Sequence, residues 1–311
     1  MRHVVRRLSA GEAERTEKER PVKAELAALP TSSYLSILKH PVMHFGICLQ
    51  CAIAVRNEAS HRAEMTSQLL FGELYRILDH YQGWLKIRTS YDDYEGWIDE
   101  RQSTPLEEEE FLRIFNADTP CVSDLVQMIR NETTKEFFPV LLGSSLPGIE
   151  AQYFTINGEN YLYEGQVSDS TLLEEAESPQ EILMAKQSIL DDAGIYMHAP
   201  YLWGGRSPFG LDCSGYVQMV YKMKKIKLLR DASQQATQGE VVSLLDESEP
   251  GDLVFFDNEE GQIIHAGILI DRTHVIHCSG QVRIDPIDHE GIFSGKEEKY
   301  THKLRVIKRV V

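Results

Sequence analysis

The sequence predicts an α+β fold built from more than one domain, and three observations support this prediction. A chain of 311 residues is too long for one ordinary hydrophobic core. Short apolar runs separated by Gly and Asp turns fill residues 43–178, which is typical of small β-barrels. From residue 179 onward, helical periodicity precedes a series of strands. We therefore expect one or two small barrels, followed by an α+β domain over residues 179–311.

The first 42 residues differ in composition from the rest of the chain. The stretch from Glu12 to Lys23 is dense in charge and has no periodic apolar face, which predicts a disordered tail. Arginines near residue 1 would suit a signal peptide, but no apolar segment follows them, so export by a standard signal is not expected. A wrongly assigned start is the alternative, with translation beginning at Met43 instead of Met1.

The barrel expected over residues 43–110 depends on five short runs with strand character. These runs are residues 52–55, 65–71, 75–78, 84–88 and 96–98. Gly and Asp residues separate the runs, and the close spacing predicts antiparallel strands joined by tight turns.

A second strand-rich region is expected over residues 111–178. The runs 137–143 and 161–165 bracket Asn157-Gly158, a dipeptide that favours a tight hairpin turn. The region lacks the Gly-Trp pattern of the first barrel, so its position alone predicts a second, divergent barrel. Residues 168–179 are polar and acidic, and we expect a linker there.

Two helices are expected before the last strands. The first carries an apolar stripe at Ile182, Ala185, Ile189 and Ala193. The second begins at Cys213 and carries apolar residues at Tyr216, Val217, Val220 and Tyr221. A loop rich in Gly and Pro, residues 200–210, leads into this second helix.

Cys213 is the candidate nucleophile because of its place at the start of a helix. The first-turn N–H groups and the helix dipole favour a thiolate, which is the nucleophilic form. Asp212 occupies the N-cap position, where its carboxylate can accept from those N–H groups. An acid beside a thiolate opposes its charge, so we expect Asp212 to face a substrate cation or the backbone. A buried structural cysteine is the alternative interpretation.

Two histidines are expected on a hairpin downstream. Residues 263–270 and 275–278 are apolar runs joined by a short turn, and a turn centred on Asp271 would place His265 directly opposite His277. His265 would then take the proton of Cys213, and His277 would orient the His265 ring. Two histidines satisfied within a sheet are the alternative. Cys278 is a fourth residue of a type that can bind metals, beside Cys213, His265 and His277. No recognised short ligand pair is present, and no metal site is expected.

The overall composition limits the possible partners. The formal net charge of −16 argues against nucleic acids and anionic membrane surfaces. Hydrophobic residues make up 42% of the chain, and the apolar runs are too short for a membrane-spanning helix. Five cysteines without repeated spacing fit a reducing compartment better than a disulfide framework. We expect no cofactor.

Several blocks of the sequence, in order, resemble the NlpC-type cell-wall cysteine peptidases, a papain-like group. The blocks are residues 200–216 with Asp-Cys-Ser-Gly at 212–215, residues 229–235, 250–253, 265–268 and 276–280. The resemblance runs from about Gln180 to the C-terminus and implies a papain-like domain over residues 179–311. It assigns Cys213 as nucleophile, His265 as base and His277 as orienter. The barrel motifs at residues 72–73, 83–87 and 94–98 resemble a bacterial SH3-like domain.

Members of this group with N-terminal SH3-like barrels resemble γ-D-glutamyl-L-diamino acid dipeptidyl peptidases, which require a free N-terminal L-alanine. The resemblance implies that Asp212 and Ser214 bind the substrate ammonium and that Tyr94 reaches into the site from the barrel. Glu64 is a further candidate for the amine pocket. Tyr201 and Trp203 are expected to line the cleft, and Arg206 or Arg230 to face substrate carboxylates, with a structural role the alternative for Arg230.

The expected function is hydrolysis of the γ-D-glutamyl–diamino acid bond in small, free murein peptides, through a thioester on Cys213. Together with the missing signal peptide, this predicts cytoplasmic recycling of murein peptides, with no nucleic acid, membrane or obligate protein partner. A papain-like amide hydrolase or transferase of other specificity is one alternative. A non-catalytic protein that binds wall peptides is the other. Diaminopimelate and lysine both remain open as the third residue of the peptide.

Overall fold

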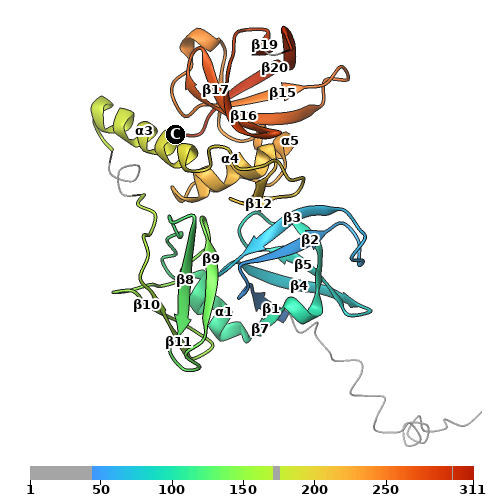
Figure 1. Cartoon of the computed structure of the whole chain (residues 1–311), viewed down its shortest axis with the longest axis vertical. Helices are drawn as coiled ribbons and strands as arrows, with labels where there is room; N and C mark the ends of the chain where they lie inside the picture. The colour runs from blue at the N-terminus through green and yellow to red at the C-terminus, as the bar shows by residue number, and fades with distance from the viewer. Residues whose placement is uncertain (1–43, 171–175, 296) are drawn as a thin grey trace, which may run out of the picture. The chain divides into compact units, whose positions relative to one another are not determined.

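The computed structural model describes residues 44–170, 176–295 and 297–311, which fold into three sheet-containing regions (Figure 1). The disordered tail or alternative start expected for residues 1–42 lies outside the described residues. So do residues 171–175 of the expected linker.

The first region is a seven-stranded antiparallel sheet with the order β3-β2-β6-β5-β4-β1-β7. Its strands are β1 (His44–Ile47), β2 (Ala52–Arg56), β3 (Met65–Leu70), β4 (Leu74–Tyr81), β5 (Trp84–Thr89), β6 (Glu95–Asp99) and β7 (Thr104–Leu106), with a 3₁₀ turn at Glu100–Gln102. Buried and less buried side chains alternate along β2 and β5, as expected for strands with one face on a core. Ile53, Val55, Ile87 and Ile98 are among the residues of that core.

The second region is a four-stranded antiparallel sheet with the order β10-β11-β8-β9. Its strands are β8 (Val126–Asn131), β9 (Phe137–Leu141), β10 (Tyr153–Ile156) and β11 (Glu159–Tyr163). Asn157 and Gly158 join β10 to β11 with φ angles of 52° and 75°, the backbone that a two-residue hairpin of type I′ requires. The expected turn is therefore present, whereas a second SH3-like barrel stays a prediction.

A shared hydrophobic core joins these two regions. Helix α1 (Glu108–Phe115) follows the first sheet, and the ring of its Phe111 stacks on Phe45 of β1 with centroids 4.1 Å apart. Phe71 of the first region packs against Phe154 of the second. The boundary expected at residue 110 falls inside α1, which belongs to this common core.

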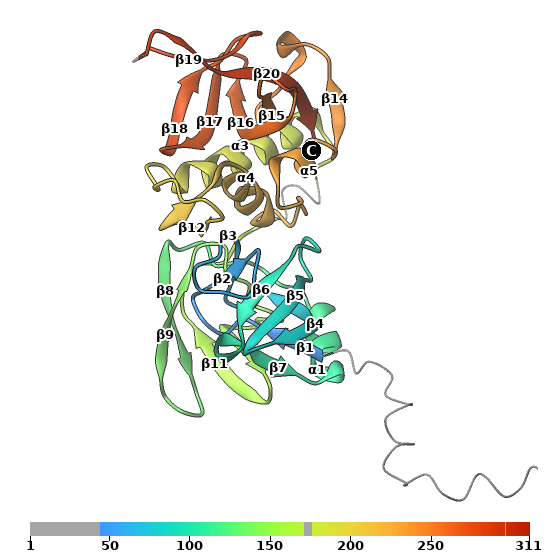
Figure 2. The same cartoon turned by 90° about the vertical axis from the view of Figure 1, so that its right-hand side faces the viewer.

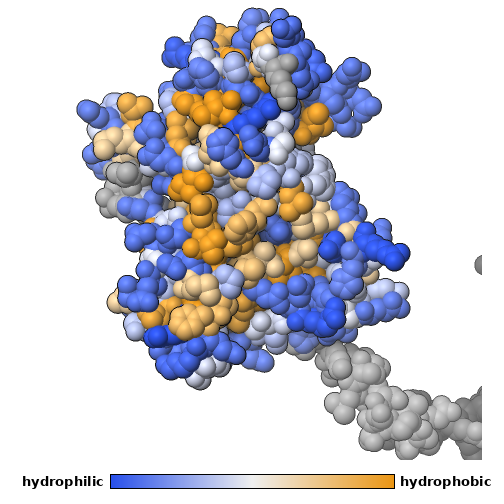
Figure 3. Space-filling model, viewed as in Figure 1, coloured by the Kyte–Doolittle hydropathy of each residue, from blue (hydrophilic) through white to orange (hydrophobic). Residues whose placement is uncertain are grey.

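Helix α3 (Pro179–Ile195) opens the C-terminal region. Ser178 caps it in a capping box with Glu181, and Pro179 occupies the first helical position, where a missing N–H costs nothing. Ala185, Ile189 and Ala193 are buried, as their spacing predicts, whereas Ile182 of the same predicted stripe is 40% exposed. Figure 3 shows several hydrophobic patches on the surface, and Leu183 and Met184 near the start of α3 are 59% and 56% exposed.

The C-terminal sheet has the order β14-β20-β15-β16-β17-β18, with β19 paired to β20. Its strands are β14 (Glu240–Val242), β15 (Leu253–Asp257), β16 (Ile263–Asp271), β17 (His274–Ser279), β18 (Gln281–Pro286), β19 (Gly291–Ser294) and β20 (Lys299–Arg309), with a 3₁₀ turn at Leu245–Glu247. Helices α3 and α4 (Cys213–Lys222) lie together beside this sheet, and α4 contacts β16 and β17 (Figure 2). The strand pair β12 (Arg206–Ser207) and β13 (Gly210–Leu211) precedes α4, and α5 (Ala232–Gln235) follows it.

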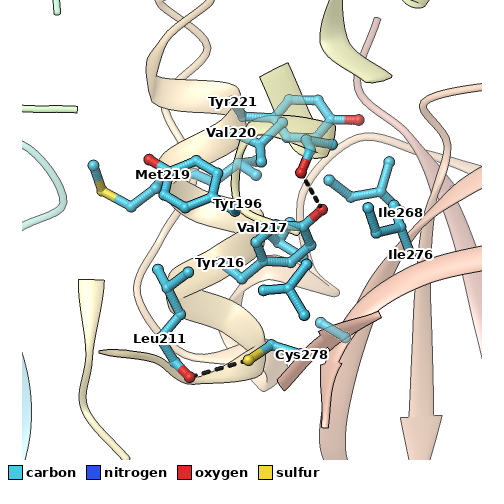
Figure 4. Close-up of a cluster of buried hydrophobic side chains, with 14 of the residues drawn as sticks. Tyr196, Leu211, Tyr216, Val217, Met219, Val220, Tyr221, Ile268, Ile276 and Cys278 are labelled. Atoms are coloured by element: carbon cyan, nitrogen blue, oxygen red, sulfur yellow. Dashed lines mark hydrogen bonds between the residues drawn. The ribbon is translucent and has the colours of Figure 1, made fainter. Parts of the chain in front are cut away.

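Every residue of α4 is buried. Its apolar side chains pack with β16 and β17 in the core drawn in Figure 4, where Tyr216 and Val217 lie beside Ile268 and Ile276. Cys278 belongs to the same core, and its Sγ donates to the carbonyl of Leu211 at 3.1 Å. The helix therefore depends on its neighbours on all sides.

Two polar side chains of α4, Lys222 and Gln218, have partners in the first region. Nζ of Lys222 donates to Glu73 at 2.6 Å, and Nε2 of Gln218 donates to Asp92 at 2.8 Å. Arg206 of β12 donates to both Glu73 and Gln218. Because these groups are buried, each would be costly without its partner. The first sheet therefore supplies part of the interior on which the helix of Cys213 depends.

Among the helices of residues 44–170, 176–295 and 297–311, none is long and apolar enough to cross a membrane.

Candidate active site

Cys213 is the first residue of α4, at the position predicted for it. Asp212 is the N-cap, and its carboxylate Oδ1 accepts from the backbone N–H of Gly215 at 2.6 Å. The preceding loop passes close to the first sheet. Gly204 has a φ of 74°, and a side-chain Cβ there would lie 2.4 Å from the carbonyl oxygen of Met65. Glycine is therefore required for the loop to pass β3 on its way to the nucleophile.

The carboxylate of Asp212 is already neutralised within the protein. Nη2 of Arg230 donates to it at 2.6 Å and Nη1 at 3.0 Å, and the N–H of Gly204 donates at 2.9 Å. Nη1 of Arg230 also donates to Oγ of Ser214 at 3.1 Å. Asp212 and Ser214 do lie beside Cys213, but the guanidinium of Arg230, which is 1% exposed, already occupies the place of a cation.

The surroundings of Cys213 favour the protonated thiol. Burial, and then the negative charge of Asp212, raise its pKa from 9.0 to about 11, while backbone N–H groups of Ala266 and Ser214 act in the opposite direction. The sequence predicted a lowered pKa from the helix N-terminus alone. That prediction is wrong because the whole side chain is buried, which penalises the charged form more than the first-turn N–H groups favour it.

His265 of β16 and His277 of β17 are hydrogen-bonded to each other, with His265 Nε2 and His277 Nδ1 2.8 Å apart. They are not the direct cross-strand partners that the sequence predicted. The turn lies at Arg272 and Thr273 and is not centred on Asp271. A bulge between Leu269 and Asp271 then changes the pairing by one residue, so that His277 pairs with Gly267 and lies diagonal to His265. The shift is two residues, which keeps both histidines on one face of the sheet.

Gly267 makes room for this diagonal contact. A Cβ at Gly267 would lie 3.1 Å from Cβ of His277 and 2.7 Å from the side chain of Val275. Without that Cβ, the two imidazoles meet across the space that the Gly267 side chain would fill.

Three further residues complete the histidine cluster, and sequence reasoning missed them. Nε2 of His277 lies 2.9 Å from Oδ2 of Asp285 in β18, and Nη2 of Arg283 lies 2.7 Å from the same oxygen. The ring of His302 in β20 packs on His265, with centroids 4.2 Å apart. The turn at Gly280 was a usable signal for Asp285. Pairing residues 277 and 283 across it places Arg283 opposite His277 and Asp285 on the same face.

Both histidines of the predicted pair are neutral. Burial lowers the pKa of His265 well below 6.5, and its neighbours His277, His302 and Arg283 lower it further. Burial also lowers the pKa of His277, against the opposing effect of Asp285. A neutral His265 is a proton acceptor, which is the state that a general base requires.

The thiol lies against the strand that carries His265. Its Sγ is 4.0 Å from the carbonyl oxygen of Ile264, and the N–H of Ala266 faces the sulfur. Within the described residues, no hydrogen bond joins Cys213 to His265. Catalytic hydrogen bonds are commonly long without substrate and tighten when it binds. Cys278 faces the α4 core instead, so it does not join the two histidines as a metal ligand.

A cavity of about 530 Å³ opens over Cys213. It brings together residues of the first region, the loop and start of α4, the start of α5, and β16: Thr66, Tyr94, Trp203, Asp212, Cys213, Ser214, Asp231, Ala232, Ser233, Ile263 and Ile264. Of the predicted binding residues, Tyr94, Trp203, Asp212 and Ser214 are therefore at the cavity. Glu64 borders it through Trp203, whose Nε1 donates to Oε1 of Glu64 at 2.6 Å. Tyr201 is 36% exposed and is not part of the cavity wall.

Arg206 does not face the substrate, which corrects the prediction. It is 2% exposed and lies behind α4, where it pairs with Glu73. It is not part of the cavity wall. The sequence showed a cation in the nucleophile loop but not the buried carboxylate that neutralises it. Arg230 also points inward, so neither arginine is available for a substrate carboxylate.

Comparison with known proteins matches two parts of the chain to protein families. Residues 198–301 match the NlpC/P60 family, and residues 55–102 match the bacterial dipeptidyl-peptidase SH3 domain. The first match contains Cys213, His265 and His277, and the second contains Tyr94 and Glu64.

Individual relatives agree with these matches. A gamma-D-glutamyl-L-lysine dipeptidyl-peptidase of Bacillus subtilis is 39% identical over 29% of this chain and 31% of its own length. The Bacillus cereus protein of the same name is 31% identical over 34% of this chain and 33% of its own length. The chain thus spans about a third of the length of both relatives. Dipeptidyl-peptidase 6 of Lysinibacillus sphaericus is 25% identical over 75% of this chain and 88% of its own length.

The fold extends this likeness beyond the catalytic part. The crystal structure of an NlpC/P60 family protein from Bacillus cereus has a TM-score of 0.69 to this structure at 19% identity, and the match covers 85% of this chain and 99% of that one. The arrangement of strand-rich N-terminal regions before the C-terminal domain is thus a known one. Residues 198–301 thus match the NlpC/P60 family, and residues 55–102, which precede them, match the bacterial dipeptidyl-peptidase SH3 domain.

Proposed function

We propose that the chain hydrolyses the γ-D-glutamyl–diamino acid bond of free murein peptides that begin with L-alanine. One observation carries this proposal: Tyr94 of the SH3 domain and Trp203 of the nucleophile loop enclose, with Asp231, the cavity that holds Cys213. A cavity walled by the SH3 domain suits a short peptide end better than a long polymer. The names of the relatives, gamma-D-glutamyl-L-lysine dipeptidyl-peptidase and dipeptidyl-peptidase 6, support the same specificity.

The reaction begins with proton transfer from the thiol of Cys213 to Nδ1 of His265. Sγ then attacks the γ-carbonyl carbon of D-glutamate and forms a tetrahedral oxyanion, which the first-turn N–H groups of Cys213 and Ser214 are placed to stabilise. The C–N bond breaks, and the leaving amine takes the proton from His265. The product on the enzyme is a thioester, which water hydrolyses with His265 again as the base.

Asp231 is the better anchor for the substrate ammonium. It lines the cavity, and burial raises its pKa more than the charge of Arg230 lowers it. No salt bridge to Asp231 is present within the described residues. Asp212, by contrast, has Arg230 as its partner. A ligand ammonium beside Asp231 would supply the missing cation, and Tyr94 limits the space beyond it.

Incubation of L-Ala-γ-D-Glu-meso-diaminopimelate with the wild type and with Cys213→Ala, followed by mass spectrometry, tests this proposal. The L-lysine peptide and an N-acetylated copy run alongside. We expect L-Ala-D-Glu to appear only from the free-amine peptides and only with Cys213 present. Cleavage of the acetylated copy as well would leave a peptidase without the dipeptidyl specificity. Binding without cleavage would favour the wall-peptide-binding alternative.

We further propose that this reaction belongs to the recycling of murein peptides in the cytoplasm. All five cysteines are free, including Cys48, Cys121 and Cys278 in the interior, which suits a reducing compartment. Fractionation of the native host, with immunodetection of the protein, tests the location. Recovery of the protein outside the cytoplasmic fraction would contradict it.

A further inference from the structure

We propose that Asp285 selects which ring nitrogen of His265 acts as the base. The inference rests on the proposed peptidase function for its catalytic meaning, but it is a statement about proton positions that can be measured without substrate. Asp285 touches neither Cys213 nor the cavity, so it is a positioning residue that acts through His277.

A line of hydrogen bonds connects the two residues. Oδ2 of Asp285 lies 2.9 Å from Nε2 of His277, and Nδ1 of His277 lies 2.8 Å from Nε2 of His265. The rings of His277 and His265 are nearly perpendicular, at 86°, with centroids 5.0 Å apart. His277 is completely buried, so no solvent molecule replaces either partner.

The charge of Asp285 determines the direction of every proton in this line. An ionised carboxylate only accepts, so Nε2 of His277 carries a hydrogen. His277 is neutral, so its Nδ1 is unprotonated and accepts. Nε2 of His265 must then be the donor. In neutral His265 this leaves Nδ1, the nitrogen assigned to the thiol, with its lone pair free for the proton of Cys213.

Asp285 is held in the ionised state that this role requires. Burial alone would raise its pKa, but the hydrogen bond and charge of His277 and the charge of Arg283 together lower it. Arg283 pairs with His277 across β17 and β18, and its Nη2 holds Oδ2 of Asp285 at 2.7 Å. His302, the other titratable group at the cluster, has a pKa lowered to about 4 and is uncharged at neutral pH.

Without the carboxylate, the two neutral tautomers of His277 are comparable in free energy. In the second, Nδ1 of His277 donates to Nε2 of His265, which places the hydrogen of His265 on Nδ1. That nitrogen then has no lone pair for the thiol. The site would keep its shape and lose its base, as happens in serine proteases when the carboxylate behind the histidine is changed to an amide.

The test measures tautomers and kinetics in the same proteins. Histidine labelled with ¹⁵N gives long-range ¹H–¹⁵N correlation spectra that identify which nitrogen of His265 and His277 is protonated. In the wild type we expect a hydrogen on Nε2 in both. In Asp285→Asn we expect a mixture or the reversed tautomers, with kcat lowered on the order of 10²-fold or more and KM changed little. Asp285→Glu, which keeps the charge, should recover the wild-type tautomers and part of kcat.

Asp271→Asn is the matched control. Asp271 also contacts a histidine in the same sheet, His274, but that pair is at the surface, with both side chains about half exposed. The Asp271→Asn variant should keep the wild-type tautomers and the wild-type kcat. If Asp285→Asn does not fold, the wild-type spectrum still shows whether Nε2 of His277 and Nε2 of His265 carry the hydrogens.

A hydrogen on Nδ1 of His277 in the wild type would overturn the proposal. Unchanged tautomers and kcat within twofold of wild type in Asp285→Asn would overturn it equally. Failure of the peptidase function itself has a different signature, because the wild type would then show the expected tautomers but cleave no peptide.

Discussion

Arg206 and Glu73 form a buried two-point ion pair between the loop before the nucleophile and the SH3 domain. Nη1 and Nη2 of Arg206 donate to the two carboxylate oxygens of Glu73 at 2.7 and 2.9 Å. Lys222, at the other end of α4, donates to the same carboxylate at 2.6 Å. Burial would raise the pKa of Glu73, yet the two cations lower it to about 2. One carboxylate of the SH3 domain thus holds both the loop and the helix of Cys213.

Removing the charge of Glu73 should destabilise the protein strongly. Glu73→Gln leaves Arg206 and Lys222 buried with less compensation, and the loss of one partner of such a cluster costs about 3–5 kcal/mol. Urea denaturation measures the free energy of unfolding. Glu95→Gln is the matched control, because Glu95 pairs with Lys86 and Arg88 at the surface. It should cost less than about 1 kcal/mol. Equal effects of the two changes would refute the role assigned to Glu73.

Acidification should destabilise the protein from about pH 6.5 downward. The unfolded chain protonates its histidines near their ordinary pKa of about 6.5, whereas the folded protein keeps His302 neutral until about pH 4. Between these values the unfolded state binds more protons, so unfolding becomes more favourable as the pH falls. His265 and His277, with lowered pKa values, act in the same direction.

His302→Phe isolates one part of this acid sensitivity. The phenyl ring keeps a ring beside His265 and removes the titrating group. Thermal unfolding between pH 4 and 8 should show the melting temperature of the variant falling less steeply below pH 6.5, while the two curves run parallel above pH 7. A steeper fall in the variant would contradict the lowered pKa of His302.

The alkylation rate of Cys213 should keep rising to high pH. With a thiol pKa of about 11, the thiolate fraction increases throughout the range from pH 7 to 10. Iodoacetamide labelling of the native protein, followed by peptide mass spectrometry, gives the rate at this residue. The same peptide in unfolded protein provides the reference. A plateau below pH 7 would show a thiolate already present in the resting enzyme.

Asp231→Asn should weaken selection for a free amine. The variant removes the cavity carboxylate assigned to the substrate ammonium, so kcat/KM for the free-amine peptide should fall at least about tenfold, as for a lost charge-assisted contact. The rate on the N-acetylated peptide should not fall with it. Asp246→Asn, at an exposed site in the turn at Leu245–Glu247, is the control. A parallel loss on both peptides would assign Asp231 to general structure instead.

Local patterns were sufficient to place the candidate nucleophile and the candidate base on their elements. The helix at Cys213, its Asp212 cap and the strands of His265 and His277 all follow from short-range rules on periodicity and turn residues, and the structure contains each of them. The register between the two histidine strands did not follow, because the turn lies at Arg272 and Thr273 and a bulge before Asp271 leaves one residue unpaired, which no short-range rule predicts. Both histidines still share a face, since the shift is an even number of residues.

The charged partners could not be predicted in the same way. Arg206 and Glu73 are 133 residues apart in sequence, and Arg230 and Asp212 belong to different loops. An arginine beside a nucleophile looks the same in sequence whether it binds substrate or a buried carboxylate. Only the packing of α4 between the SH3 domain and the C-terminal sheet shows which carboxylate each arginine meets.

The complete burial of α4 has a consequence for engineering this chain. A chain trimmed to residues 179–311 would expose Gln218, Lys222 and Arg206 to water and remove their fixed partners, directly behind Cys213. The SH3 domain is therefore not an interchangeable attachment for targeting. A chimera with another SH3 domain must keep residues equivalent to Glu73 and Asp92, or its α4 surface must be redesigned. Only then can a new specificity be measured.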